Sequence, residues 1–280
     1  MIYLALSIFC SSLIFVIFKV FQKFKIDNFQ AIIVNYFVAS SLGWILGFDS
    51  ISNAHPEDWI LICVLIGAIF ISLFILMAKV SQDLGVSTAS VSVKMSVVIP
   101  VVIGMLLYGD KLSFQLTLGI LLSLAAIFLI TQKESGFHFN HIKWPIVLFV
   151  GNGLLDSVLK YAQTHYVQSN DVSLFSASCF GLAAVAGMIA FPFLKYKSAL
   201  KKKNMIAGVV LGVPNFGSIY FLIMTLESTN MKSSIFFPIN NIGIVLLSTV
   251  LSVLIFKEGL NRKNIIGIAI GVLSILLITI

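Results

Sequence analysis

Charged side chains are scarce in this sequence. Only 10% of its 280 residues are charged, whereas 59% are hydrophobic, and the mean hydropathy is +1.06. A soluble domain of this size needs far more charged surface, so a soluble protein is excluded. Apolar runs of about 20 residues recur along the chain, and each is long enough to cross a hydrocarbon core of ~30 Å. The composition therefore predicts a polytopic α-helical membrane protein.

Cysteine and the common catalytic motifs are also sparse or missing. Cys10, Cys63 and Cys179 fall inside apolar segments without CxxC spacing, which is typical of small buried hydrophobes and not of a disulfide framework or metal site. The sequence has no HExxH, GxSxG, paired intramembrane aspartate or Walker A motif. His138 and His141 are three residues apart but lack an evident third ligand. We expect no enzyme, no metal, no cofactor and no ATP-driven pumping by this chain.

The net charge of +7 does not indicate nucleic-acid binding. Its lysines stand in short loops between apolar runs, without a basic stripe and interleaved aromatics. Met1 leads directly into an apolar run without a basic region or a cleavage signature, so we interpret the start of the chain as a membrane span and not as a signal peptide.

The apolar runs and polar breaks predict ten spans joined by short loops that leave no room for a soluble domain. The expected spans are 2–21, 29–48, 59–80, 87–108, 112–131, 144–166, 172–194, 205–226, 233–256 and 263–280.

An internal repeat divides these spans into two sets of five. A shift of 148 residues aligns the fifth span with the tenth, and a shift of 141 aligns the ends of the first and sixth. The aligned pairs are Asp110 with Glu258, Leu112 with Leu260, Gly119 with Gly267, Ser123 with Gly271, Thr131 with Thr279, Lys19 with Lys160 and Gln22 with Gln163. The predicted repeats are 1–133 and 144–280.

Five spans per repeat place the second repeat upside down relative to the first. Inverted repeats around a site at the membrane midplane are a recurrent design of secondary transporters, because two similar halves can exchange conformations. The predicted fold is therefore an all-α membrane protein of ten transmembrane helices in two inverted five-helix repeats, with transport as its function.

The same segments resemble a known family. Each repeat has an acidic residue after its fourth span, then a leucine and a glycine-containing fifth span: Gly109-Asp110-Lys111-Leu112 before Gly119, and Lys257-Glu258-Gly259-Leu260 before Gly267. With Pro100 in span four and Lys19 late in span one, this pattern resembles the EamA-like ten-span carriers of the drug/metabolite transporter superfamily. The resemblance covers essentially the whole chain, and it implies a multi-pass protein of the cell (inner or plasma) membrane but no particular substrate.

The loop charges predict an orientation that differs from the family habit. Members commonly carry a basic loop between spans two and three, whereas residues 49–58 here hold three acids and no Lys or Arg. Most Lys and Arg residues flank the odd-numbered loops, and only Lys111 and Lys232 lie opposite. The positive-inside rule then places both termini outside the cytoplasm.

Four charged residues stand out within predicted spans, where a charge is costly and usually faces a cavity or a partner. Lys94, Asp156 and Lys160 are deep, and Lys19 is about a turn from the end of span one. Asp156 and Lys160 share a helix face at i, i+4. On one interpretation the two residues form a structural ion pair, or the lysine extends to the membrane interface. On the other, Asp156 is a proton-coupling carboxylate that is released from Lys160.

Lys94 has no acid within helical reach and is the strongest candidate for a substrate contact. By the repeat, it is expected to face Asn240 and Asn241 of span nine. Tyr36 and Tyr220 are candidate pocket walls or ordinary packing residues. Three intramembrane lysines against one carboxylate favour a substrate bearing a carboxylate or phosphate.

We therefore expect a secondary carrier that exports a small polar metabolite, such as an amino acid or another anion, with proton coupling through Asp156. A lipid-carrier flippase or a channel of the same superfamily is the alternative. The partners expected are a small-molecule substrate and the lipid bilayer. The small-residue motif at Gly267 and Gly271 serves either intramolecular packing or a homodimer.

Overall fold

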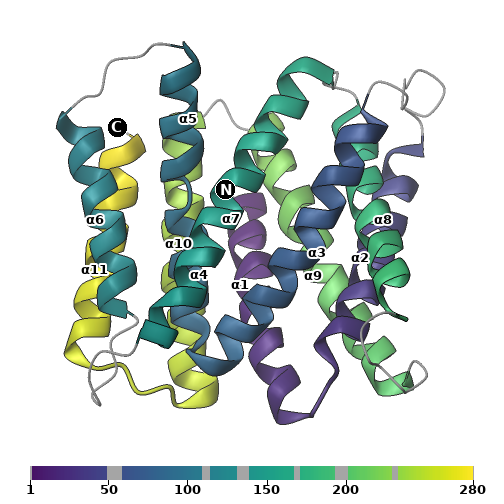
Figure 1. The fold of residues 1–280 in the computed structure, drawn as a ribbon, viewed down its shortest axis with the longest axis horizontal. Coiled ribbons are helices and arrows are strands. Elements are labelled where there is room, and N and C mark those ends of the chain that lie inside the picture. The colour runs from purple at the N-terminus through teal and green to yellow at the C-terminus, as the bar shows by residue number, and fades with distance from the viewer. Residues whose placement is uncertain are drawn as a thin grey trace. The chain divides into compact units, whose positions relative to one another are not determined.

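A computed structural model describes residues 2–48, 59–108, 114–130, 139–166, 171–192, 201–228 and 233–279. All of its regular elements within these ranges are α-helices (Figure 1). They are α1 (Ile2–Lys23), α2 (Asn28–Leu46), α3 (Ile60–Asp83), α4 (Val86–Met95), α5 (Val98–Tyr108), α6 (Phe114–Ile130), α7 (Phe139–Tyr166), α8 (Val172–Ala190), α9 (Lys202–Ser228), α10 (Ser233–Phe256) and α11 (Arg262–Thr279).

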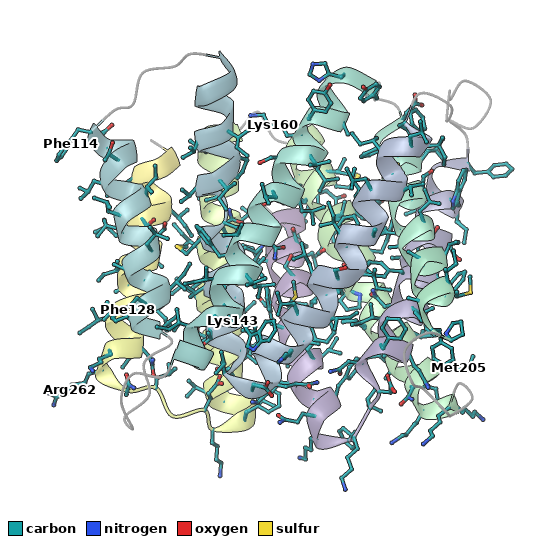
Figure 2. The ribbon with its side chains drawn as sticks, in the orientation of Figure 1. Phe114, Phe128, Lys143, Lys160, Met205 and Arg262 are labelled. Carbon is teal, nitrogen blue, oxygen red and sulfur yellow. The ribbon has the colours of Figure 1, made fainter. Side chains whose placement is uncertain are left out.

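The ten predicted spans are present, with one difference. Span four consists of two helices, α4 and α5, because the helix is interrupted at Ser96 and Val97. Eight segments among the described residues are long and apolar enough to cross a membrane, and Thr117–Ile130 in α6 is a shorter apolar helix. Large apolar side chains such as Phe114 and Phe128 project outward from α6 (Figure 2), as expected where lipid is the solvent.

The helices form two compact units, and each unit contains helices of both sequence repeats. The first comprises Met1–Lys19, Leu76–Asp156 and Ser218–Ile280, and the second comprises Val20–Ile75 and Ser157–Gly217. The compact units therefore do not coincide with the two halves of the sequence.

In the first unit, α6 packs beside α11, its equivalent in the second repeat (Figure 1). The Asn264 amide donates to the carbonyl of Ile130 over 2.8 Å, and the Ser274 hydroxyl donates to that of Gly119, also over 2.8 Å. The contacts run in opposite chain directions, so the two helices are antiparallel. Gly267 lies directly on the α6 backbone, where an added Cβ would be 2.9 Å from the Ile130 nitrogen. The small-residue motif of α11 thus serves packing within the chain.

In the second unit, α2 packs on its own equivalent, α8, in the same antiparallel manner. The Ser40 hydroxyl donates to the carbonyl of Ala177 over 2.8 Å, and Gly47 lies against Leu174 further along. The antiparallel direction of these equivalent helices is what inverted repeats require, because inversion reverses the direction of every equivalent span.

Candidate functional site

The interruption of span four follows from Pro100. Proline has no amide hydrogen, so the carbonyl four residues earlier, on Ser96, cannot receive the usual helical hydrogen bond. The Ile99 amide donates to this carbonyl instead, over 2.9 Å, which makes a tight turn between α4 and α5. Broken helices at membrane depth occur where backbone lines a binding site.

Lys94 lies in the last turn of α4, directly before this interruption. Its side chain is half-buried. The serines on the preceding turns of α4 are satisfied by their own helix, since the Ser90 hydroxyl donates to the Ser87 carbonyl and that of Ser92 donates to the Thr88 carbonyl. These hydroxyl groups therefore make their hydrogen bonds within α4. Lys94 is the charged group beside the break.

Asp156 on α7 lies close enough to Lys94 for the two charges to interact electrostatically. Gly153 makes this possible, because an added Cβ there would lie 2.5 Å from the Ile99 Cβ. Asp156 lies about one turn along α7 from this contact. Its side chain is exposed, so the two charges are not sealed inside the packed core.

Asn240 and Asn241 lie close to this level on α10. The hydroxyls of Ser87 and Ser252 are 3.2 Å apart, and the Glu258 carboxylate lies over Gly85, so α10 runs antiparallel to α4. Lys94 is seven residues after Ser87 on α4, and Val245 is seven residues before Ser252 on α10, so the two are at the same level. Asn240 and Asn241 are about one turn further along α10, toward the break. Asn240 is 3% exposed, and its Oδ1 has no hydrogen-bond partner among the described residues. A buried acceptor without a donor costs about 1–3 kcal/mol, which is expected at a ligand site.

Lys19 has a partner on α3. Its Nζ donates to the carbonyl of Gln82 over 2.6 Å, and the Gln82 amide donates back to the Phe18 carbonyl over 2.8 Å. Carbonyls in the last turn of a helix have no partner within it, so Lys19 caps α3 and joins it to α1.

The remaining predicted residues lie elsewhere. Tyr36 belongs to the second unit, where it is fully buried among Phe70, Phe74 and Phe180. Tyr220 is half-buried in the first unit with its ring against Phe221. Lys160 is exposed on α7, in the part of that helix that belongs to the second unit.

Some contacts have no signal in the sequence. The Sγ atoms of Cys63 and Cys179, 116 residues apart, lie 3.1 Å from each other as free thiols. Asn35 is fully buried with neither side-chain polar atom paired among the described residues. Among those residues, no group of three or more His, Cys, Asp or Glu side chains is arranged to hold a metal. His55, His138, His141 and Asp110 lie outside the residues whose side chains are described.

Glu258, one of the paired motif acids, has a defined place. Its carboxylate lies over Gly85, where φ is +109° and any Cβ would collide with it. Gly85 precedes the first residue of α4, so the acid of the second repeat lies at the N-terminus of the first repeat's broken helix, where a negative charge is favourable.

Comparison with known proteins agrees with this architecture. The EamA-like transporter family matches residues 1–132 and 143–280. The chain belongs to the EamA-like transporter family. It is thus a multi-pass membrane transporter of the drug/metabolite transporter type, with ten spans in two inverted repeats, and as such it takes a small-molecule substrate within a lipid bilayer.

Two relatives extend the comparison. An uncharacterised protein of Haemophilus influenzae is 26% identical over 283 residues, covering 97% of this chain and 95% of its own. A solved crystal structure covers 99% of this chain and 94% of its own, with a TM-score of 0.64 at 15% identity, which supports the fold alone.

Proposed function

We propose that this EamA-like transporter is a secondary active carrier that exports a small polar metabolite bearing a carboxylate or phosphate, such as an amino acid, across the cell membrane. The observation that carries the proposal is the position of Lys94. It is an intramembrane ammonium at a helix break, and its countercharge comes from a different helix. A charge retained inside a membrane span at such cost is expected to contact a substrate or coupling ion.

In this proposal the substrate competes with Asp156 for Lys94. The substrate anion approaches the ammonium and displaces the Asp156 carboxylate. The freed carboxylate then takes a proton from the solution, which couples one proton to the transport cycle. The Oδ1 of Asn240, which has no partner among the described residues, then accepts from a donor on the substrate, such as an ammonium or hydroxyl group.

Alternating access needs elements that change conformation around the site. The break at Ser96 and Val97 supplies backbone that is not held by regular helical hydrogen bonds, directly beside Lys94. We propose that the repeats at 1–133 and 144–280 exchange conformations during the cycle, as in other inverted-repeat carriers.

Uptake into proteoliposomes tests the proposal. The purified protein is offered radiolabelled amino acids, organic acids and sugar phosphates, and the wild type is compared with Lys94→Ala. We expect saturable uptake of one anionic class, with at least a 100-fold loss in the variant. Lys79→Ala is the matched control, because Lys79 also lies in an α3 span but contacts the Trp144 ring, 3.8 Å from its centroid.

Other outcomes identify the alternatives. Saturable uptake that Lys94→Ala leaves unchanged would remove Lys94 from the site. Conductance without saturation would indicate a channel, and activity only toward a lipid-linked substrate would indicate a flippase.

A further inference from the structure

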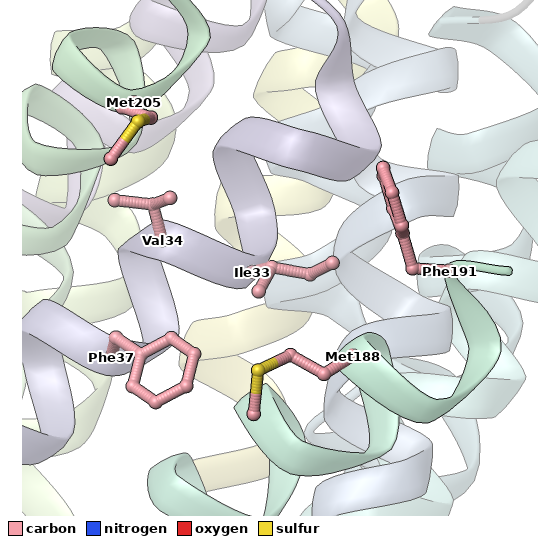
Figure 3. A pocket seen from close by; sticks show the side chains of 6 residues that line it. All are labelled: Ile33, Val34, Phe37, Met188, Phe191 and Met205. Carbon is pink, nitrogen blue, oxygen red and sulfur yellow. The ribbon is translucent and has the colours of Figure 1, made fainter. Parts of the chain in front are cut away.

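The second unit contains an apolar pocket whose lining includes none of the charged residues discussed above. Its volume is ≈ 520 Å³, and it lies between α2, the end of α8 and the start of α9 (Figure 3). The lining residues are Ile33, Val34, Phe37, Met188, Phe191 and Met205. Phe37, Met188 and Met205 are at least 40% exposed, so the pocket is open at the surface of the unit.

The closely tied starts of α2 and α9 form one end of this pocket. The Gln30 Oε1 accepts from the Asn204 amide over 2.7 Å and from the Lys201 backbone amide over 3.2 Å. Gly208 lets α9 lie on α2, since an added Cβ there would be 2.6 Å from the Ala31 carbonyl. The pocket is therefore a preformed feature of two helices held in contact.

Lysines gather at the same end. Lys201, Lys202 and Lys203 begin α9, and Lys23 and Lys25 lie at the turn between α1 and α2; all five are exposed. The Lys203 ammonium donates to the Lys25 carbonyl over 2.8 Å, which brings the two groups of lysines together. The acid in this region, Asp27, is engaged as the N-cap of α2, where it accepts from the Gln30 amide.

The dimensions match one leaflet of a bilayer. Phe37 lies nine residues beyond the start of α2, or ~14 Å along the helix at 1.5 Å per residue. Half of a ~30 Å hydrocarbon core is about the same length. Phe24, between Lys23 and Lys25, is an exposed apolar side chain at the same end of the pocket.

We propose that this pocket, with its five lysines, is a specific binding site for an anionic phospholipid. One acyl chain lies along Ile33, Phe37 and Met188, and the lysines hold the phosphate headgroup. Charge complementarity selects the occupant, because five ammonium groups at the mouth of an apolar pocket match a lipid whose headgroup is negative. The site does not depend on the substrate proposed above.

Native mass spectrometry of the full-length protein in non-ionic detergent tests this assignment. The probes are phosphatidylglycerol and phosphatidylcholine with the same acyl chains. We expect preferential retention of phosphatidylglycerol. The double variant Lys201→Gln/Lys202→Gln should bind it roughly 25-fold more weakly, since each lysine near a membrane surface contributes about a factor of five.

Matched controls separate a site from general attraction. Met188→Trp fills the pocket and should abolish retention, whereas Ile189→Trp, on an adjacent exposed position outside the lining, should not. Lys257→Gln/Lys263→Gln removes two exposed lysines elsewhere and should leave binding unchanged. Equal retention of both lipids, an ineffective Met188→Trp, or an equal loss in the control lysine variant would each overturn the proposal.

Discussion

At the scale of single residues, the candidate site depends on charged side chains and on glycines, whose lack of a side chain lets other groups approach closely. Lys94 and Asp156 interact electrostatically, and α7 packs on Ile99 close to both residues because Gly153 has no Cβ. Glu258 likewise rests on Gly85. Glycine is required at both positions for a reason of space, and at Gly85 for its φ of +109° as well.

Asp156→Asn tests the role of the carboxylate. The amide keeps the shape of the side chain but cannot release a proton, so we expect transport to lose its dependence on pH and on a proton gradient while substrate exchange continues. Uptake and counterflow measured from pH 5 to 8 in proteoliposomes check this, with Asp83→Asn, an exposed acid at the end of α3, as control. An unaltered pH profile in Asp156→Asn would exclude this carboxylate as the coupling group.

Gly85→Ala tests the packing of Glu258 on α4. The methyl group would collide with the carboxylate and the backbone would be strained, so we expect a loss of roughly 1–3 kcal/mol in stability. Gly259→Ala is the matched control, because nothing lies within 4 Å of its added Cβ. The melting temperatures of both variants in detergent give the comparison, and an equal effect would contradict the contact.

At the scale of helices, proline and small residues determine where elements break and how closely they approach. Pro100 interrupts span four because it has no amide hydrogen to donate to the Ser96 carbonyl, which accepts from the Ile99 amide instead. Gly208 and Gly212 bring α9 onto α2, where an added Cβ would lie 2.5 and 2.7 Å from the Cβ atoms of Val34 and Val38.

Pro100→Ala restores the missing amide and should allow α4 and α5 to join into one helix. We expect the maximal transport rate to fall about tenfold or more while the protein remains as stable as the wild type, because the backbone beside Lys94 loses its freedom to rearrange. Pro145→Ala removes a proline within α7 and serves as control. An unchanged rate in Pro100→Ala would show that the break does not contribute to the cycle.

Gly208→Leu tests the contact between α9 and α2. The side chain would meet the Ala31 carbonyl, which cannot move aside, so we expect destabilisation by about 1–3 kcal/mol. Val209→Leu, on an exposed position one residue away, should be nearly neutral. Thermal unfolding followed by tryptophan fluorescence distinguishes them.

At the scale of the whole molecule, equivalent helices of the two repeats pair with each other. α6 lies against α11 in one unit and α2 against α8 in the other, both antiparallel. Pairing across the repeats explains why neither sequence half forms a compact unit alone. Truncation at the repeat boundary should therefore leave both halves unfolded.

The charge bias predicts the orientation in the membrane, which is open to a direct test. A cysteine introduced at Lys202, in a variant with Cys10→Ala whose remaining Cys63 and Cys179 are buried, should react with an impermeant maleimide in inverted vesicles and not in intact cells. A cysteine at Gln115, at the start of α6, should show the opposite pattern. Reversal of both results would place the termini in the cytoplasm.

The sequence by itself determined the class, the spans and the inverted repeat. Long apolar runs can only be helices in lipid, because every backbone hydrogen bond must be made within the segment. The match of residues 1–132 and 143–280 to the family confirms the resemblance drawn from the motif acids, leucines and glycines. Lys94 and Asp156 were separately recognisable because a charge within a span is rare.

Only the tertiary structure showed that Asp156 interacts with a charge on another helix. Helical spacing considers Asp156 with Lys160, since a one-dimensional pattern records neighbours on the same helix only, whereas the electrostatic interaction with Lys94, 62 residues away, joins two helices. The same holds for Cys63 with Cys179, for Lys19 as a cap of α3, and for the pocket between α2, α8 and α9. Apolar helices specify where they span but not their neighbours, because in lipid the contact is chosen by close packing of particular side chains and not by hydrophobicity.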